Sequence, residues 1–278
     1  QNSITVDRYI LENIDVLFGP SSTIYGSDAL GGAIYMQTKN PKLLNDSDNK
    51  KFSGNVLTNY SDVNKGKAAH FDFNYATTKF ASLTSVSYND FGDLKMGKQK
   101  NGKNGYFGER LFYVQNINGV DTQVANDDKY VQKFTGYKQY DFMEKIHYQP
   151  NNATKHNLNL QYSFTTDIPR YDRLTDVDAT GNLKTAVWNY GPQKRLLAAY
   201  KFSKEKAILN SDMNLGISFQ NIEESRITRN FGSAKLNSRI EKVAVFGFTS
   251  DFKSKIGNGD LLYGADVYYD DLKSTANQ

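Results

Sequence analysis

The sequence predicts an all-β protein, a partial transmembrane antiparallel β-barrel of about nine strands. Three observations lead to this prediction. After residue 51, apolar and polar residues alternate with a period of two, as they do in a sheet with one apolar and one wet face. Most of the alternating segments reach the ~9 to 11 residues that a tilted strand needs to cross a bilayer, whereas globular strands cluster near ~5 to 6. The connections between them alternate in length, as in outer-membrane barrels.

Composition agrees with strands and excludes several classes of protein. Among 278 residues, 13% are aromatic, with 19 Tyr and 17 Phe, and such side chains fit a pleated surface. A mean hydropathy of -0.63 and the absence of an apolar run near ~18 residues exclude a transmembrane helix. Without cysteine there is no disulfide framework or thiolate metal site. A net charge of +4 without a basic helical stripe predicts no nucleic-acid partner.

Residues 1–40 differ from the rest of the chain. Two alternating apolar runs, Ile14 to Phe18 and Ala33 to Thr38, predict two strands. Between them, Ser27 is placed to cap a short helix, and Gly31 to end it in the left-handed conformation. Taken alone, this pattern also fits a compact α/β turn of a soluble domain. The residues that form the turns are Gly19, Pro20, Tyr25, Gly26, Gly31 and Gly32.

The rest of the chain predicts nine strands, each with an apolar and a polar face. One charged residue, Glu144, falls on an otherwise apolar face, which is tolerable near a membrane interface and costly at the midplane. The strands are expected at residues 52–61, 67–76, 79–91, 137–148, 155–166, 195–203, 209–224, 239–252 and 260–272.

The connections between these segments predict which side of a membrane each lies on. Outer-membrane barrels have short periplasmic turns and long outer loops, whereas a soluble sandwich or propeller has no reason to alternate them. The first outer connection, 62–66, breaks the rule by being short. The expected short turns are 77–78, 149–154, 204–208 and 253–259, and the expected long loops are 92–136, 167–194 and 225–238.

The stretch Asn13 to Lys39, NIDVLFGPSSTIYGSDALGGAIYMQTK, resembles the end of the plug domain of TonB-dependent receptors. Its FGPSS turn, its Tyr25-Gly26-Ser27 and its closing strand stand in the family's order. Phe18 replaces a residue that is usually basic. The resemblance implies that residues 1–42 are the C-terminal part of an α/β plug domain and residues 43–278 the N-terminal part of the barrel.

The same resemblance implies a Gram-negative outer-membrane receptor with a plugged barrel of about 22 strands. The inner-membrane TonB complex is the expected partner, through a segment N-terminal to Gln1. Gln1 opens a polar stretch without the pattern of a signal peptide, so the start of the protein is expected to be missing. Later strands are expected beyond Gln278, because nine strands alone would leave two open sheet edges. Outer-membrane lipid and lipopolysaccharide are further expected partners.

Three further stretches resemble the haem and haemoglobin receptors of this family: Asp167 to Thr175, Trp188 to Arg195, and Asn221 to Arg226. They imply import of haem or haemoprotein-derived iron, with haem as a transported ligand and no intrinsic cofactor. The alternatives are a receptor for a ferric siderophore or corrinoid, and a non-transporting outer-membrane binding or adhesion barrel. The upstream sequence separates an importer from a binding or adhesion barrel, because an adhesin needs neither a plug nor a TonB box.

The loop 167–194 holds the candidate ligand-binding residues. Planar aromatic rings can stack on a flat ligand and guanidinium groups can pair with carboxylates, while two prolines stiffen the loop. Alternatively, the aromatic residues fold the loop onto itself or form the upper aromatic girdle. The candidates are Arg170, Tyr171, Arg173, Trp188 and Tyr190.

The loop 92–136 is cationic and is a second candidate surface. Such a loop can attract an anionic ligand, for example a haem propionate or a ferric siderophore. The favoured interpretation is contact with lipopolysaccharide phosphates or simple solubility. Its basic residues are Lys95, Lys98, Lys100, Lys103 and Arg110.

His70 and His147 are expected to face the wet interior, where each is able in principle to ligate haem iron or a metal. The favoured interpretation is a polar interior residue against the plug. No His, Asp or Glu pair has metal-site spacing, and no Ser-His-Asp or GxSxG arrangement occurs. The sequence therefore predicts no enzyme, no catalytic residue and no metal site.

Overall fold

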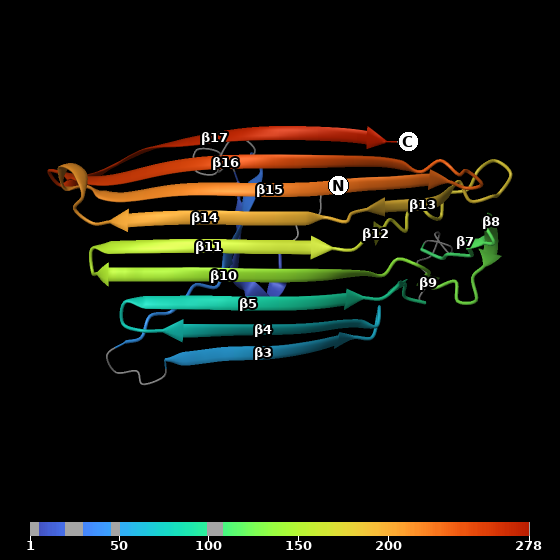
Figure 1. Ribbon diagram of the computed structural model, residues 1–278, viewed down its shortest axis with the longest axis horizontal. Coiled ribbons are helices and arrows are strands. Elements are labelled where there is room, and N and C mark those ends of the chain that lie inside the picture. Colours follow the sequence, from blue (N-terminus) through green and yellow to red (C-terminus); the bar gives the residue numbers. More distant parts are fainter. Residues whose placement is uncertain (1–5, 20–29, 46–50, 99–107, 278) are drawn as a thin grey trace.

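The computed structural model describes residues 6–19, 30–45, 51–98 and 108–277 (Figure 1). Within these ranges, one antiparallel sheet contains nine long strands, and consecutive members of the nine are neighbours in the sheet. The nine predicted strands are confirmed, in the predicted order. They are β3 (Phe52–Ser61), β4 (Gly66–Ala76), β5 (Phe80–Phe91), β10 (Tyr137–Asn151), β11 (Thr154–Thr165), β14 (Lys194–Lys204), β15 (Asp212–Asn230), β16 (Asn237–Ile256) and β17 (Gly259–Asn277).

The two ends of the sheet differ in their connections. The left-hand end in Figure 1, here called the turn end, carries the connections 77–79, 152–153, 205–211 and 257–258. The right-hand end, the loop end, carries 62–65, 92–136, 166–193 and 231–236. The predicted alternation is confirmed, except at the third long loop.

The prediction of a long loop at 225–238 is wrong. β15 and β16 continue through most of it, and Thr228 lies opposite Asn237. The pattern breaks down there because charged residues occupy both faces, yet the backbone pairing continues regardless of the side chains.

Short strands order the two long connections at the loop end. In the loop 92–136, β6 (Leu94–Lys95) pairs with β9 (Val131–Gln132), and β7 (Phe112–Ile117) with β8 (Val120–Ala125). In the next connection, β12 (Ile168–Pro169) pairs with β13 (Thr185–Tyr190), which also pairs with β15.

The described helices are short 3-10 turns. They are η1 (Arg8–Ile10) and η2 (Ile208–Asn210). In the residues that the structure describes, no helix is long and apolar enough to cross a membrane.

The N-terminal segment forms a separate hairpin of β1 (Leu11–Phe18) and β2 (Gly32–Thr38), as the two apolar runs predict. Gly32 has a φ of 148°, and an added Cβ would lie 2.4 Å from the carbonyl oxygen of Leu17, so only glycine fits. Gly19 donates its N–H to the carbonyl of Gly31 at 3.2 Å. The expected short helix, and Pro20, Tyr25 and Gly26 of the motif, lie outside the described residues.

Contacts with the N-terminal segment distinguish the two faces of the sheet. Lys39 Nζ lies 2.6 Å from a carboxylate oxygen of Asp72, and Ser87 Oγ donates to Asp7 at 2.5 Å. The face that carries Asp72 and Ser87 is called the inward face, and the opposite one the outward face. A small buried cluster at this contact consists of Ile10, Leu83 and Met143.

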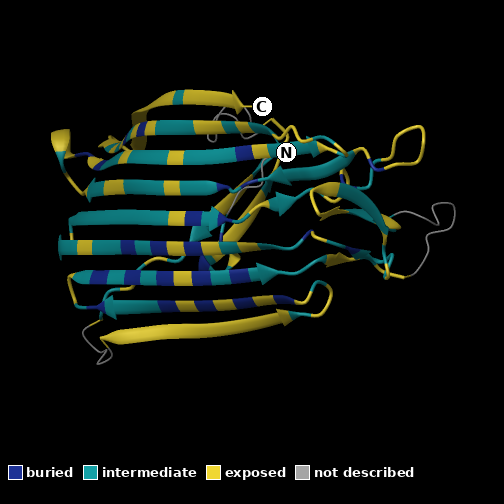
Figure 2. Ribbon diagram, turned by 45° about the vertical axis from the view of Figure 1, so that its right-hand side comes forward, coloured by how far each residue is buried: buried dark blue, intermediate teal, exposed yellow. Residues whose placement is uncertain are grey.

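Strand register extends the two faces across the whole sheet, because residues directly opposite each other point to the same side. Figure 2 shows the resulting alternation of buried and less buried positions along β4 and β5. The predicted separation of the faces is confirmed. Inward are His70, Asp72, Asn159 and Gln161, and outward are Phe71, Phe73, Leu158, Leu160, Tyr162, Ile217 and Phe219.

Candidate ligand-binding site at the loop end

The hairpin β12–β13 places two candidate aromatic residues on the inward face. Trp188 lies opposite Thr228 and Tyr190 opposite Arg226, and even-numbered residues of β15 point inward. An aromatic girdle requires rings on the outward face, so these two rings do not form one.

The guanidinium groups of Arg170 and Arg226 pack against these two rings. Arg170 Cζ lies 4.9 Å from the ring centroid of Trp188 and 5.7 Å from that of Tyr190. Arg226 Cζ lies at 5.7 and 5.6 Å from the same centroids, and the rings meet edge to face at 4.8 Å. The four arginine-to-ring distances fall within the range of cation–π attraction. We call Arg170, Trp188, Tyr190 and Arg226 the arginine–aromatic cluster.

Hydrogen bonds hold Arg170 in the arginine–aromatic cluster. Its Nε lies 2.7 Å from Asp172 and its Nη1 donates to the Tyr190 hydroxyl at 3.0 Å. The bond to Asp172 raises the pKa of Arg170 and holds the pKa of Asp172 below its usual range. The ion pair therefore fixes the charge of both groups.

The other two predicted residues lie outside the arginine–aromatic cluster. Tyr171 is half-exposed and lines a pocket of 420 Å³ together with Arg170 and Tyr190. Arg173 turns away, and its Nη1 lies 3.4 Å from Asp176. The structure thus brings together three of the five candidates and leaves Arg173 apart.

Two arginines that the sequence did not assign to a site lie directly opposite each other on the inward face. Arg226 pairs in register with Arg239, and like charges in this position repel each other. Among the described residues, neither makes an ion pair with a carboxylate. Glu224 and Glu241 form a second like-charged pair two residues nearer the turn end. The pair nearer the loop end is therefore positive, and in the described part of the chain no carboxylate forms an ion pair with it.

A pocket of 340 Å³ lies beside this pair. Its lining includes Trp188, Arg226 and Arg239, with small polar residues of β16 and β17 around them. Cationic side chains and an aromatic face in one concavity suit a planar or anionic ligand. A continuous reading of the alternation past Glu224 would have found Arg226 on this face.

Comparison with known proteins points to one family of receptors. No family model matches the chain. A stretch of 90 residues is 32% identical to the ferrioxamine receptor of Yersinia enterocolitica. This stretch covers 32% of this chain and 12% of that protein. The fold of the chain is similar to that of a mutant of the ferric enterobactin receptor PfeA of Pseudomonas aeruginosa bound to enterobactin, with a TM-score of 0.59. The two sequences are 13% identical, and the match covers 95% of this chain and 36% of that receptor. The ferric yersiniabactin uptake receptor FyuA of Yersinia pestis gives a TM-score of 0.51 and 11% identity, over 95% of this chain and 48% of that one.

The chain has the fold of a part of these solved outer-membrane receptors. It spans 12% of the length of the curated relative and less than half of either solved receptor. The named relatives are receptors of ferric siderophores rather than enzymes, and the expected membership of the haem group finds no support among them. In a receptor of this family the loop end faces the cell exterior and the turn end the periplasm.

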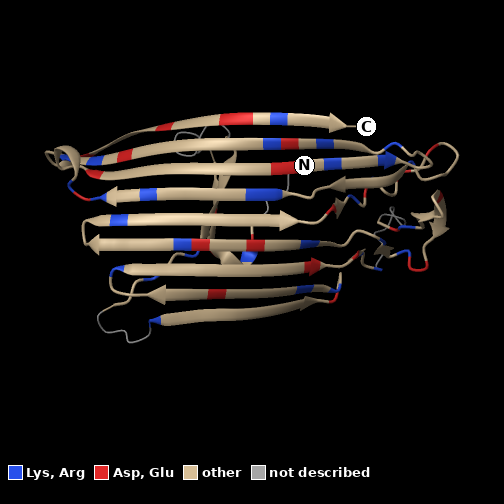
Figure 3. Ribbon diagram, viewed as in Figure 1, with Lys and Arg blue, Asp and Glu red and all other residues tan. Residues whose placement is uncertain are grey.

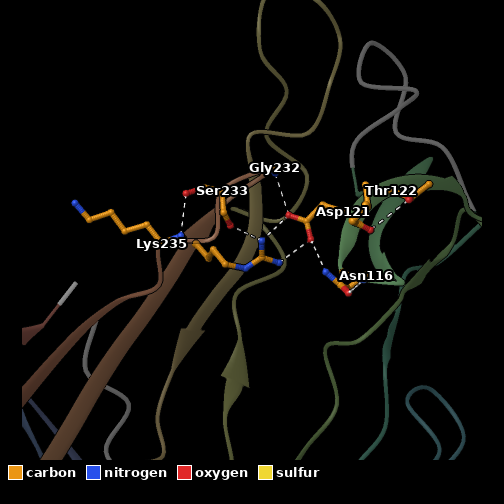
Figure 4. A network of polar contacts seen from close by, with 9 residues as sticks. Asn116, Asp121, Thr122, Gly232, Ser233 and Lys235 are labelled. Carbon is orange, nitrogen blue, oxygen red and sulfur yellow. Dashed lines mark hydrogen bonds and ion pairs between the residues drawn. The ribbon is translucent and has the colours of Figure 1, made fainter.

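The connections at the loop end are joined through Asp121 on the β7–β8 hairpin (Figure 4). Asp121 accepts two bonds from the Arg229 guanidinium, at 2.5 and 2.8 Å, and one from the Gly232 N–H at 3.0 Å. The Arg229 bonds lower the pKa of Asp121 to about 2. The connection 166–193 is joined to the same β7–β8 hairpin through Leu183, whose N–H donates to the Gln123 side chain at 2.8 Å. Three connections at the loop end therefore contact one another.

The cationic residues of the loop 92–136 have different roles. Arg110, one of the basic residues of this loop, is only 3% exposed, and its guanidinium donates to the backbone carbonyl oxygens of Lys133 and Phe112. Burial lowers its pKa to about 10, while Asp93 opposes this shift. Arg110 therefore ties the loop together from within and adds nothing to the exposed positive charge of the loop. Lys100 and Lys103 lie outside the described residues, whereas Lys95 and Lys98 lie within them.

The interior histidines make local contacts. His70 hydrogen-bonds to Ser87 at 2.7 Å and to Asp72 at 3.2 Å, and its ring stacks on Tyr9 of the N-terminal segment. His147 hydrogen-bonds to Asn157 at 2.6 Å. In the described ranges, no group of three or more His, Asp or Glu residues forms a potential metal site.

Proposed function

We propose that this chain is part of an outer-membrane importer of a ferric siderophore. The names of the relatives favour a siderophore over the haem that the sequence suggested. The observation that carries the proposal is the pair Arg226 and Arg239, directly opposed and without an ion-pair partner among the described residues. Many ferric chelates are anions, and an anion between two opposed guanidinium groups relieves their repulsion.

The arginine–aromatic cluster supplies the rest of the proposed site. Trp188 offers a ring face beside the two arginines, and the Arg170 guanidinium is held against the same ring. Tyr171 lines the neighbouring pocket. Arg173 contributes positive charge to the outer loop without contacting the cluster.

We assign residues 1–42 to the plug and 43–278 to the barrel wall. The separate β1–β2 hairpin supports this division, as do the contacts of Asp7 and Lys39 with the inward face. In the proposed mechanism, ligand capture at the loop end precedes displacement of the plug, with energy from the inner-membrane TonB complex.

The experiment measures the affinity of the full-length receptor, in isolated outer membranes, for a ferric tricatecholate, haem and a corrinoid. Replacing both Arg226 and Arg239 with Ala removes two charge-assisted contacts of ~1.5 to 3 kcal/mol each. We therefore expect the Kd for the ferric chelate to rise at least about a hundredfold. Lys253→Ala is the matched control, because it removes a positive charge from the inward face of the same strand at the turn end.

Unchanged chelate affinity in the double variant contradicts the site. If the receptor bound only haem with high affinity and the double variant lost that affinity, the ligand of this site would be haem. If cells with the folded protein took up none of the three ligands, a non-transporting binding barrel would be favoured.

A further inference from the structure

A cluster of lysines lies on the outward face near the loop end, away from the ligand-binding site. Lys194 and Lys242 approach the carboxylate of Glu223 from two neighbouring strands, each at 3.0 Å. Lys273 lies opposite Lys242 on the next strand and 3.4 Å from Asp271. Figure 3 shows these charges toward the right-hand ends of β14 to β17.

Strand register places this cluster on the side that faces away from the plug. Lys194 pairs with Glu223, Glu223 with Lys242, and Lys242 with Lys273. Their inward neighbours are residues such as Arg195 and Val243. The cluster therefore does not face the interior and cannot contact a ligand in the lumen.

An apolar band begins directly beneath the lysines. Between Lys194 and Lys204, the outward positions of β14 carry no charge, and the same holds on β15 and β16 down to the turn end. The outward side chains of these strands are Leu196, Ala198, Tyr200, Phe202, Met213, Leu215, Ile217, Phe219, Asn221, Ala244, Phe246, Phe248, Ser250, Phe252, Ser254 and Ile256.

The length of this band matches a membrane. The ten steps from Lys194 to Lys204 span ~33 Å at ~3.3 Å per residue. At a strand tilt of ~40° this projects to ~25 Å, the height of the apolar band of outer-membrane barrels. Lys194 thus lies at the outer membrane interface, and Lys204 at the periplasmic one.

We propose that Lys194, Lys242 and Lys273 bind the phosphate groups of lipid A in the outer leaflet. Glu223 holds two ammonium groups on either side of one carboxylate, which sets their spacing and leaves each with N–H donors for a phosphate. The apolar side chains below accept the acyl chains of the same lipid. Each lysine in such a position contributes about fivefold in affinity, which corresponds to about 1 kcal/mol.

The test uses the purified full-length receptor in phosphatidylcholine nanodiscs, titrated with bisphosphorylated lipid A or with its dephosphorylated form. We expect the wild type to bind the phosphorylated lipid at least tenfold more tightly. The double variant Lys194→Ala and Lys242→Ala should lose about 25-fold in affinity, while Lys194→Arg with Lys242→Arg keeps it.

The matched control is Lys204→Ala, on the outward face of the same strand at the opposite interface. Its affinity for lipid A should equal that of the wild type. Equal binding of the two lipids by the wild type overturns the proposal and needs no substitution. An equal loss in the control and the double variant also overturns it, because general surface charge then accounts for the binding.

Discussion

Asp121 and Arg229 lie 108 residues apart in the sequence, and two hydrogen bonds of 2.5 and 2.8 Å join them at the loop end of the sheet. The carboxylate comes from the β7–β8 hairpin and the guanidinium from the end of β15. The Asp121 side chain is 2% exposed and that of Arg229 18%. This pair joins the main sheet to a loop whose described short strands pair only with one another.

Replacing Asp121 with Asn should loosen the loop 92–136 while leaving the barrel intact. The substitution removes the charge that Arg229 requires and leaves the guanidinium partly buried without compensation. We expect faster cleavage within this loop by protease added to whole cells. Asp127→Asn is the control, because Asp127 lies in the same loop in an exposed pair with Lys133. Equal protection of wild type and Asp121→Asn would contradict the assignment.

Attachment of the hairpin should weaken in acid. The folded-state pKa of Asp121 is lowered to about 2, so its stabilisation is complete above the unfolded pKa of ~3.9 and is lost as the pH falls toward the folded value. Pepsin cleavage of residues 112–125, corrected for the enzyme's own pH profile, should therefore increase between pH 4.5 and 2. In Asp121→Asn this increase should be absent, and its persistence there would assign it to another group.

Replacing Trp188 with Leu should weaken ligand binding through lost cation–π contact. A cation over an aromatic face contributes ~0.5 to 2 kcal/mol, and two guanidinium groups share this ring. We expect the Kd for the ferric chelate to rise about two- to thirtyfold in Trp188→Leu, and less in Trp188→Phe. The measurement is equilibrium binding to outer membranes at matched receptor levels. Identical values for the Leu and Phe variants would mean that the ring face has no role.

Cross-linking the plug to the wall should block uptake and preserve binding. Ser87 contacts Asp7 of the N-terminal segment, so this pair is suitable for a cross-link. The sequence contains no native cysteine that would compete with it. Asp7→Cys with Ser87→Cys, joined by a short bismaleimide, should bind ligand normally but not transport it.

The control for cross-linking is Asp141→Cys with Ser163→Cys, because these two residues hydrogen-bond within the wall at 2.7 Å. That pair should transport ligand after treatment. If the protein cross-linked between positions 7 and 87 still transported ligand, the ligand would not pass along this contact.

The period of two predicted the nine strands because lipid on one side and water on the other select opposite residues at successive positions. This selection ends where the sheet leaves the membrane. Arg226 and Arg229 point to opposite faces of β15, so both faces are polar there and the pattern indicates a loop. The strand continues because its hydrogen bonds are made by the backbone.

The candidate site was only partly predictable for a related reason. Arg170, Trp188 and Tyr190 lie close in sequence and could be grouped by residue type. Arg239 joins them only through the register of β15 with β16, which the sequence pattern beyond Glu224 does not specify. Arg110 has the same charge as its neighbours, and only its burial distinguishes it.

The unequal connections also determine the order in which the sheet can assemble. The hairpins β10–β11 and β16–β17 close across the connections 152–153 and 257–258, so they lose little chain entropy on pairing. The pairing of β5 with β10 must close 92–136, and that of β11 with β14 must close 166–193, at a cost that grows with the logarithm of loop length. The two-stranded hairpins should therefore form first, and the pairings of β5 with β10 and of β11 with β14 should form last.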